Sequence, residues 1–368
     1  MNRRECLTGL AMATAAVRAP AAATRGGVSG GALMPAAPML EPRSGHTATL
    51  LADGRVLIAG GMRRNQDFLR SAEVYHPAGD RFEAVGFMTE RRVGHVAVLL
   101  RTGQVLVAGG WTGRDATARA ELFDPASGRF TAIAPMTTRR GEPRATLLAS
   151  GDVLISGGDD HDGDGGHLSS AEVFRVATLS FAATGAMRLA RVAHTATALQ
   201  DGTVLVVGGR GAGLAGAAEI FDPRSGRFGP AGELLTPRYK HTAGLLPDGR
   251  VLVAGGSDER DWNGSLASTE LYDPATRSFA AAEPMRDSRF KLPEHAVALA
   301  AGRLLVAGGS RRAEIFDPVS GHFSSVVGLM SDGWHYMTAT RLSDGRALLA
   351  GGYARNDAGT TQAWVCEA

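Results

Sequence analysis

The chain contains very little cysteine, lysine or aromatic residue for its 368 residues. It has two cysteines, Cys6 and Cys366, and two lysines, Lys240 and Lys291, while Phe, Trp and Tyr make up 6% of the sequence. Cys6 belongs to the export signal described below, so the mature chain keeps one cysteine and cannot form an intramolecular disulfide. No apolar run is long enough to span a membrane. Burial of apolar side chains must therefore supply the stability of the fold.

The first 23 residues have the pattern of an export signal. Arg3 and Arg4 precede a short, weakly apolar run, and residues 21–23 are alanines that suit a cleavage site. The paired arginines resemble a twin-arginine signal, and an ordinary secretory signal is the alternative. We therefore expect residues 1–23 to be removed, residues 24–368 to form the mature domain, and the protein to be periplasmic or secreted.

Removal of this segment would leave a chain without net charge. The full chain carries 39 Lys and Arg against 37 Asp and Glu, and the segment holds three of the arginines and one of the glutamates, which leaves 36 of each. A neutral chain with no basic stripe gives no reason to expect nucleic acid as a partner.

A stretch that begins as HTATLLADGRVLIAGG, residues 46–61, occurs seven times in recognisable form. A period near 48 residues, with four strand-like runs in each unit, is typical of β-propeller blades. Glycine within a strand costs about 0.5–1 kcal/mol relative to alanine, so we expect the paired glycines to serve a close approach of neighbouring backbones. The pairs are Gly60-Gly61, Gly109-Gly110, Gly157-Gly158, Gly208-Gly209, Gly255-Gly256, Gly308-Gly309 and Gly351-Gly352.

The first six units each contain four predicted strands, named a to d, which in the first unit are residues 46–51, 55–59, 72–75 and 81–85. Strand b is apolar throughout, as expected of a strand that is covered on both faces. The last unit lacks strand d, but residues 32–39 (ALMPAAPM) match the end of an earlier d strand, residues 131–136 (TAIAPM). We therefore predict an all-β, seven-bladed propeller with four-stranded blades, closed by the N-terminal strand.

The connections should separate onto two faces of the ring. The a–b and c–d turns are short and repeated, such as Asp53-Gly54 and Asp124-Pro125, and predict a uniform face of hairpins. The b–c loops and d–a linkers vary and should share the opposite face, which we call the loop face. Function usually resides in variable loops on a rigid scaffold, so we expect the binding site on the loop face.

The units resemble the kelch repeat. The shared pattern is an Arg-x-x-His linker, a small-residue strand, an Asp-Gly turn, an apolar strand, the glycine pair, Ala-Glu-apolar-aromatic and Asp-Pro-x-x-Gly-x-Phe, and it runs from Gly31 to the C-terminus. The resemblance implies the propeller of kelch proteins and of fungal galactose oxidase. Copper–radical chemistry of that kind needs a tyrosine cross-linked to a cysteine, and the position of Cys366 near the chain end does not suit it. We expect no cofactor, apart from a possible calcium ion.

Four repeated positions are expected to serve the fold. The kelch pattern itself has a histidine after the linker, so we expect this side chain to bond to neighbouring backbone rather than to bind a metal. The linker arginines and strand-c glutamates should form internal ion pairs, and Tyr75, Tyr272 and Trp364 should fill the strand-c aromatic position. The histidines are His46, His95, His194, His241 and His295, with Pro143 and Met337 in the other two units. The arginines are Arg43, Arg92, Arg140, Arg191, Arg238 and Arg289, and the glutamates are Glu73, Glu121, Glu172, Glu219, Glu270 and Glu314.

Departures from the repeat indicate a binding site at the sixth unit. Its b–c loop is only residues 310–313, whereas its linker gains KLPE, residues 291–294, so a notch should open between the long loops on either side. Aromatic side chains and both lysines fall on the loop face, where flat apolar area with polar tips suits carbohydrate or peptide ligands. The predicted ligand-binding residues are Tyr239, Lys240, Asp261, Trp262, Arg289, Lys291, Glu294, Asp332, Trp334, His335 and Tyr336.

A metal site is predicted in the third b–c loop. Asp160, Asp162 and Asp164 occupy alternate positions before Gly165, like the start of a calcium-binding loop. Ala171 stands where an EF-hand loop has its glutamate, so a solvated acidic loop is the first alternative, and a transition metal held by His161 and His167 is the second.

The leading hypothesis is an exported, monomeric recognition protein that binds a glycan, a sugar acid or a protein through the loop face. The alternative is a sugar-acting enzyme of the epimerase or mutarotase kind, which the resemblance to a periplasmic kelch propeller with sugar epimerase activity suggests. Glu294 and His335 would then form an acid–base pair. The fold by itself gives no reaction.

Overall fold

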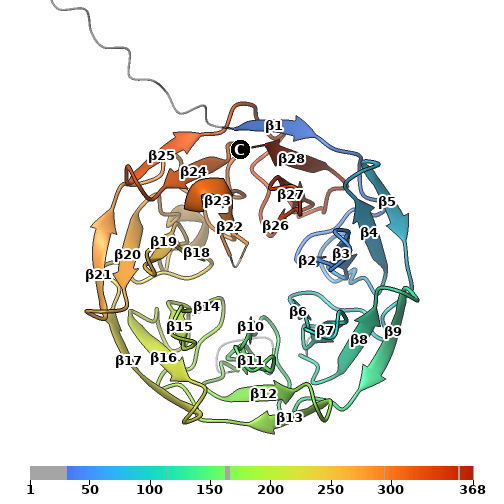
Figure 1. The fold of residues 1–368 in the computed structure, drawn as a ribbon, viewed down its shortest axis with the longest axis horizontal. Helices are drawn as coiled ribbons and strands as arrows, with labels where there is room; N and C mark the ends of the chain where they lie inside the picture. Colours follow the sequence, from blue (N-terminus) through green and yellow to red (C-terminus); the bar gives the residue numbers. More distant parts are fainter. Residues whose placement is uncertain (1–30, 114, 162–165, 294, 355–356, 368) are drawn as a thin grey trace, which may run out of the picture.

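The computed structural model describes residues 31–113, 115–161, 166–293, 295–354 and 357–367, which form a closed ring of seven four-stranded antiparallel sheets (Figure 1). The first strand of each blade lies nearest the central channel, and the others follow outward. This confirms the predicted all-β, seven-bladed propeller. The predicted export signal lies outside the described residues.

The first four blades each use four consecutive strands. Blade 1 contains β2 (Thr47–Leu50), β3 (Val56–Ala59), β4 (Ala72–His76) and β5 (Arg81–Ala84). Blade 2 contains β6 (Val96–Leu99), β7 (Val105–Ala108), β8 (Ala120–Asp124) and β9 (Arg129–Ile133). Blade 3 contains β10 (Arg144–Leu147), β11 (Val153–Ser156), β12 (Ala171–Arg175) and β13 (Ser180–Ala183). Blade 4 contains β14 (Thr195–Ala198), β15 (Val204–Val207), β16 (Ala217–Asp222) and β17 (Arg227–Glu233).

The remaining blades include two short 3-10 helices and the closing strand. Blade 5 contains β18 (Thr242–Leu245), β19 (Val251–Ala254), β20 (Thr269–Asp273) and β21 (Ser278–Ala282), with η1 (Asp261–Asn263) in its b–c loop. Blade 6 contains β22 (Val297–Ala298), β23 (Leu304–Val306), β24 (Glu314–Asp317) and β25 (His322–Ser325), with η2 (Ala300–Gly302) in its a–b turn. Blade 7 contains β26 (Thr338–Arg341), β27 (Ala347–Ala350), β28 (Ala363–Glu367) and β1 (Ala32–Pro35).

The N-terminal strand closes the ring. β1 pairs antiparallel with β28, so that Leu33 lies opposite Cys366 (Figure 1). The Leu33 N–H also donates to the carbonyl of Val327 in the linker after blade 6, at 2.8 Å. The predicted closure is therefore confirmed, and the segment joins the last two blades as well as the two chain ends.

Strand b is apolar throughout because its side chains serve two interfaces. Successive side chains of a strand point to opposite faces. Val56 and Ile58 of β3 pack with blade 7, whereas Leu57 and Ala59 pack with blade 2. All four side chains are buried. The core is thus a set of layers between blades.

The glycine pairs hold neighbouring backbones together, as predicted. The N–H of Gly61 donates to the carbonyl of Arg92 in the next linker at 2.9 Å. Gly60 has a φ of 62°, and a Cβ there would lie 2.7 Å from the same carbonyl oxygen. Only glycine fits this position without displacing the backbone.

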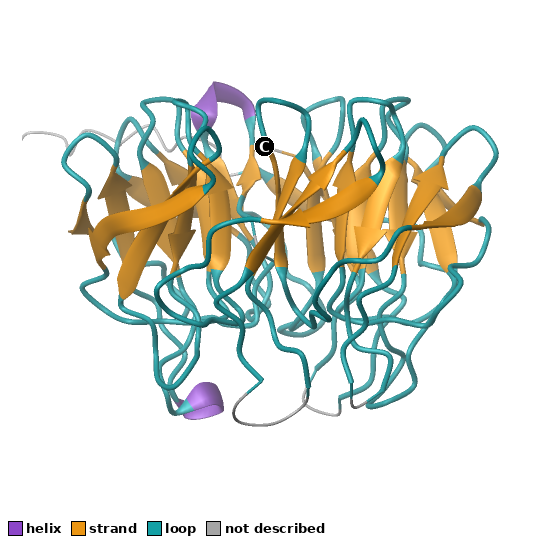
Figure 2. Ribbon diagram, turned by 90° about the horizontal axis from the view of Figure 1, so that it is seen from below, coloured by secondary structure: helices purple, strands orange, loops and turns teal. Residues whose placement is uncertain are grey.

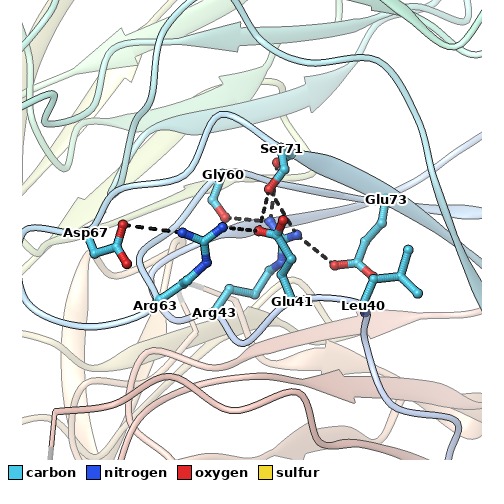
Figure 3. A network of polar contacts seen from close by, with 8 residues as sticks. All are labelled: Leu40, Glu41, Arg43, Gly60, Arg63, Asp67, Ser71 and Glu73. Atoms are coloured by element: carbon cyan, nitrogen blue, oxygen red, sulfur yellow. Dashed lines mark hydrogen bonds and ion pairs between the residues drawn. The ribbon is translucent and has the colours of Figure 1, made fainter.

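The linker arginines and strand-c glutamates form buried ion pairs in blades 1 to 6. In blade 1 (Figure 3), Arg43 bonds to Glu73 at 2.7 Å and donates to the carbonyl of Gly60 at 2.8 Å. The second oxygen of Glu73 accepts a bond from the backbone N–H of Leu40 at 2.7 Å. Each pair therefore fastens an inter-blade linker to the blade that follows it. The other pairs are Arg92–Glu121, Arg140–Glu172, Arg191–Glu219, Arg238–Glu270 and Arg289–Glu314.

Blade 7 replaces this ion pair by two tryptophans, which corrects the position expected for Trp364. Trp364 lies opposite Leu349 of strand b, in the register that Glu73 has opposite Ile58, so it occupies the glutamate position. Cys366 therefore takes the strand-c aromatic position. Trp334 holds the place of the linker arginine, and its ring centroid is 6.4 Å from that of Trp364.

Four of the five predicted histidines serve the ring, with neighbouring hydroxyl groups rather than backbone as partners. The Nε2 of His46 lies 3.0 Å from the hydroxyl of Thr338, and that of His95 lies 3.0 Å from the hydroxyl of Thr47. His194 and His241 make the same kind of contact with Ser156 and Thr195. Burial lowers the pKa of all four, to about 3 for His95.

The assignment of His295 to this position was wrong. Leu292 packs against Gly255 of blade 5 as His95 packs against Gly60 of blade 1. Leu292, which belongs to the KLPE segment, takes the ring position, and the additional residues follow it. His295 therefore lies at an exposed site on the wall of the central channel.

The two faces of the ring differ as predicted. Figure 2 shows short turns on one side of the strands and longer loops on the other. Within the described ranges, neither helix is long or apolar enough to cross a membrane.

Candidate functional site

One residue in each inter-blade linker has a left-handed backbone conformation. These residues immediately precede the ring position described above, and their φ values lie between 48° and 60°. The N–H of Gly94 donates to the carbonyl of Gly45 at 3.0 Å, and the N–H of Gly45 donates to that of Tyr336 at 3.0 Å. Such bonds link most of these positions around the mouth of the central channel. The positions are Gly45, Gly94, Glu142, Ala193, Lys240, Lys291 and Tyr336.

Four of these positions carry large polar side chains despite their conformation. Glycine adopts it freely, whereas other residues pay about 1–2 kcal/mol, and such strain clusters at functional sites. Glu142, Lys240, Lys291 and Tyr336 are therefore the first candidates for a site at the mouth.

Lys291 lies among aromatic rings from four loops. Its Nζ is 4.0 Å from the ring centroid of Trp262 and 5.4 Å from that of Tyr353. It is also 5.2 Å from the ring of Phe290 and 5.9 Å from that of Tyr336. Contacts of this length stabilise a cation by about 0.5–2 kcal/mol. We call these five residues the lysine cage.

The ammonium group of Lys291 has no carboxylate partner among the described residues. It donates a hydrogen bond to the hydroxyl of Tyr353 at 2.7 Å, and the residue is only 7% exposed. Burial, with the like charge of Lys240, lowers the pKa of Lys291 to about 8. A buried charge normally has a counter-ion, so this arrangement favours a negatively charged ligand.

Asp261, an acidic side chain whose charge acts on Lys291, is held by other residues. Asp261 accepts bonds from the hydroxyl of Tyr239 at 2.5 Å and from the Nζ of Lys240 at 2.8 Å. Burial alone would raise the pKa of Asp261, but these two hydrogen bonds lower it. Lys240 is thereby paired with a carboxylate, whereas Lys291 has no such partner among the described residues.

Trp262 presents an exposed ring in a fixed orientation. Phe290 and His335 contact it edge-on, with centroids 5.0 and 4.8 Å away. The Nδ1 of His335 lies 3.2 Å from the carbonyl of Phe290, and burial lowers the pKa of His335. Trp262 is 44% exposed. A clamped, exposed aromatic face suits stacking against a sugar ring.

Two cavities open beside the lysine cage. A notch of about 280 Å³ lies over the short loop of blade 6, with Trp262, Arg311, Asp332 and His335 in its wall. A larger cavity of about 460 Å³ occupies the channel mouth and includes Tyr336 of the cage. A notch therefore lies where the sequence predicted one, and Trp262 belongs both to its wall and to the lysine cage.

The structure brings together seven of the eleven predicted ligand-binding residues around Trp262. They are Tyr239, Lys240, Asp261, Trp262, Lys291, His335 and Tyr336. Asp332 also lines the notch. Glu294 lies outside the described residues.

Two predicted binding residues belong to the core instead. Arg289 is fully buried and paired with Glu314, like the other linker arginines. Trp334 is 9% exposed and packs between blades 6 and 7. Both occupy the same linker position, which always points into the ring, so neither side chain offers a surface to a ligand.

The predicted calcium loop is only partly described. Asp162 and Asp164 lie outside the described residues. The side chain of Asp160 is 44% exposed, and its Oδ1 lies 2.5 Å from the Nδ1 of His161. In the part of the chain that the structure describes, no group of three or more His, Cys, Asp or Glu side chains could hold a metal.

Sequence reasoning missed Tyr353, Phe290 and Glu142 as site residues. Tyr353 reaches the cage from the b–c loop of blade 7 through a backbone bridge with His335. Glu142 lies at the linker position that glycine holds in blades 1 and 2. Alignment of the residue before the ring histidine would have identified Glu142, because a charged residue replaces glycine there.

Comparisons with known proteins support the fold. Residues 91–137 match the family model of the kelch motif. No curated protein sequence matches the chain. Among solved structures, the chain is similar to a fungal alcohol oxidase described as having catalytic diversity among the AA5 family, in complex with copper. The TM-score is 0.74 at 16% identity, over 92% of this chain and 76% of that chain. At this identity the likeness shows the fold alone.

The residues of this chain do not fit a copper–radical centre. Cys366 is fully buried among apolar side chains between blades 6 and 7, opposite Leu33, and burial raises its pKa to about 11. No tyrosine shares that core cluster. We therefore derive no step through copper.

Proposed function

The chain is a kelch-repeat β-propeller, and we propose that its loop face binds a carbohydrate that carries a carboxylate. The observation that carries the proposal is the ammonium group of Lys291, which lies in the lysine cage without a carboxylate partner among the described residues. A ligand carboxylate would supply the missing counter-charge in a partly desolvated site, where such a bond is stronger than in water.

The neighbouring side chains favour a sugar as the carrier of that carboxylate. Trp262 offers an exposed ring held edge-on by Phe290 and His335, which suits stacking against a pyranose. The hydroxyl of Tyr353 lies beside the cation and provides a polar tip for a ligand hydroxyl. A hexuronic or sialic acid combines these features.

The signal-like residues 1–23 support action of the protein outside the cytoplasm. The paired arginines and the small residues at 21–23 are the basis of this part of the proposal. Fractionation of cells that express the full chain tests it. Mature protein in the cytoplasm alone would contradict it.

The binding proposal is tested by titration calorimetry with glucuronic acid and sialic acid. Each acid is compared with its carboxyl-reduced form, and Trp262→Ala is compared with Phe87→Ala, which removes a ring that is 62% exposed away from the cage. We expect binding of an acid, weaker binding of its reduced form, and a loss of affinity in Trp262→Ala only. Equal affinities for acid and reduced sugar would contradict the proposal.

One observation favours an enzyme acting on sugars as the second candidate. Lys291 combines a lowered pKa with a hydrogen bond to Tyr353, and such a pair is suited to moving a proton on a bound substrate. Any acid that binds would be followed by NMR for conversion. Turnover that Tyr353→Phe abolishes while binding persists would support an enzyme. A bound sugar that stays unchanged would support binding without catalysis.

A further inference from the structure

Glu142 places a carboxylate at the channel mouth. Its φ is 48°, at a position where blades 1 and 2 have glycine. The residue is half-buried, and its side chain makes no hydrogen bond or ion pair with the described residues. An ionised carboxylate is a pure acceptor of hydrogen bonds. It therefore faces the cavity ready to accept donors from a ligand.

An aromatic ring lies beside Glu142 because the preceding residue is glycine. A Cβ on Gly141 would lie 2.1 Å from the ring of Trp111, whereas other linkers have residues such as Val93 and Val192 at this position. The absence of a side chain lets the indole of Trp111 lie against the backbone of blade 3. Trp111 and Glu142 both line the cavity of about 460 Å³.

This cavity borders the lysine cage at one residue. Tyr336 lines the channel mouth, and its ring centroid lies 5.9 Å from the Nζ of Lys291 and 6.0 Å from the ring of Tyr353. A ligand held at the cage would enter the cavity if it extended past Tyr336.

We propose that the channel mouth is a second sugar subsite, so that the ligand is an acidic oligosaccharide. This inference rests on the proposed function, which places the acidic sugar at the lysine cage. The adjoining sugar is neutral: its ring packs on Trp111, and two vicinal hydroxyls donate to the two oxygens of the Glu142 carboxylate. The negative charge of Glu142 disfavours an acidic group next to its own carboxylate, while Arg144, which donates to the carbonyl of His194, lines the same cavity.

The test measures affinities for an acidic monosaccharide and the matching disaccharide. The probes are sialic acid against sialyl-galactose and glucuronic acid against glucuronosyl-galactose, with wild type, Glu142→Gln and Trp111→Ala. We expect the disaccharide to bind at least tenfold more tightly to wild type. Trp111→Ala should remove most of that gain without weakening the monosaccharide, and Glu142→Gln should lower the ratio of disaccharide affinity to monosaccharide affinity.

The outcomes separate the two proposals. Equal affinities for monosaccharide and disaccharide in wild type, or a gain that Glu142→Gln leaves intact, would overturn the second subsite and leave the acidic site standing. Equal weakening of both ligands by Glu142→Gln would also overturn it, because Glu142 would then belong to the cage. Absence of binding by every acid and disaccharide would instead overturn the proposed function. Glu142→Gln keeps the shape of the residue, so the test stands if Trp111→Ala fails to fold.

Discussion

The Nζ of Lys291 lies 4.0 Å from the ring centroid of Trp262, which gives this nearly buried ammonium an aromatic neighbour where a carboxylate would be usual. The nearby carboxylate of Asp261 is bonded to Lys240 and Tyr239. Charge and stacking surface thus lie together at one side of the channel mouth. The predictions below test the ring that holds this arrangement and then the arrangement itself.

Two tryptophans should respond differently to the same substitution. Trp334→Ala should lower the free energy of unfolding by about 3–5 kcal/mol, because the side chain is buried against Trp364 between blades 6 and 7. Trp262→Ala should leave stability nearly unchanged, because that ring is 44% exposed. Chemical denaturation measures both, and equal losses of stability would contradict the assignment.

Deletion of residues 31–39 should lower the melting temperature sharply. The deletion removes β1, leaves the edge of β28 unpaired and exposes the core around Leu33 and Met39. A chain that lacks only residues 1–23 is the control and should melt like the full chain. The closing role of β1 would be refuted by equal melting temperatures for the two deletions.

Loss of one buried arginine should cost far more than loss of an exposed one. Arg92→Met leaves Glu121 buried without its partner at 2.7 Å, which should cost about 3–5 kcal/mol of stability. Arg250→Met removes an exposed pair with Asp248 at 2.7 Å and should cost less than about 1 kcal/mol. Similar unfolding free energies for the two variants would show that the buried pair does not fasten the linker.

Acid should destabilise the ring through its buried histidines. Burial lowers the pKa of His95 to about 3, so the folded chain keeps this side chain neutral while the unfolded chain binds a proton below about pH 6.5. The contribution of neutral His95 to the free energy of unfolding is therefore complete above about pH 6.5 and is lost as the pH falls toward about 3. His95→Leu, which copies Leu292 of blade 6, should flatten the stability curve between pH 6 and 4. Parallel curves for wild type and variant would contradict this account.

The ring was predictable from the sequence because the features that build it recur in every unit. The glycine pairs and the continuously apolar b strands recur in all seven units, and the linker arginines recur in six. Each feature makes the same kind of contact in every blade that has it. Errors arose where one blade departs from the others. The KLPE insertion concealed that Leu292, not His295, takes the ring position.

The site was less predictable because it depends on which side chain a single position carries. Trp334 looked like a loop-face aromatic, but it replaces the buried arginine of the other linkers and faces Trp364. Tyr353 lies in the cage because the b–c loop of blade 7 folds back toward Lys291, which the sequence does not show. Four polar residues of the site share the linker position directly before the ring position. That position identifies the site only once its left-handed backbone conformation is known. The residues are Glu142, Lys240, Lys291 and Tyr336.

The central claim is that Lys291 binds a ligand carboxylate, and the most direct measurement is the affinity ratio between an acidic sugar and its carboxyl-reduced form in wild type and Lys291→Met. Methionine keeps an apolar side chain in the cage and removes the charge. We expect wild type to prefer the acid and Lys291→Met to bind both forms equally weakly. The preference should also fade as the pH rises through about 8, where free Lys291 loses its proton. An unchanged preference for the acid in Lys291→Met would contradict the claim.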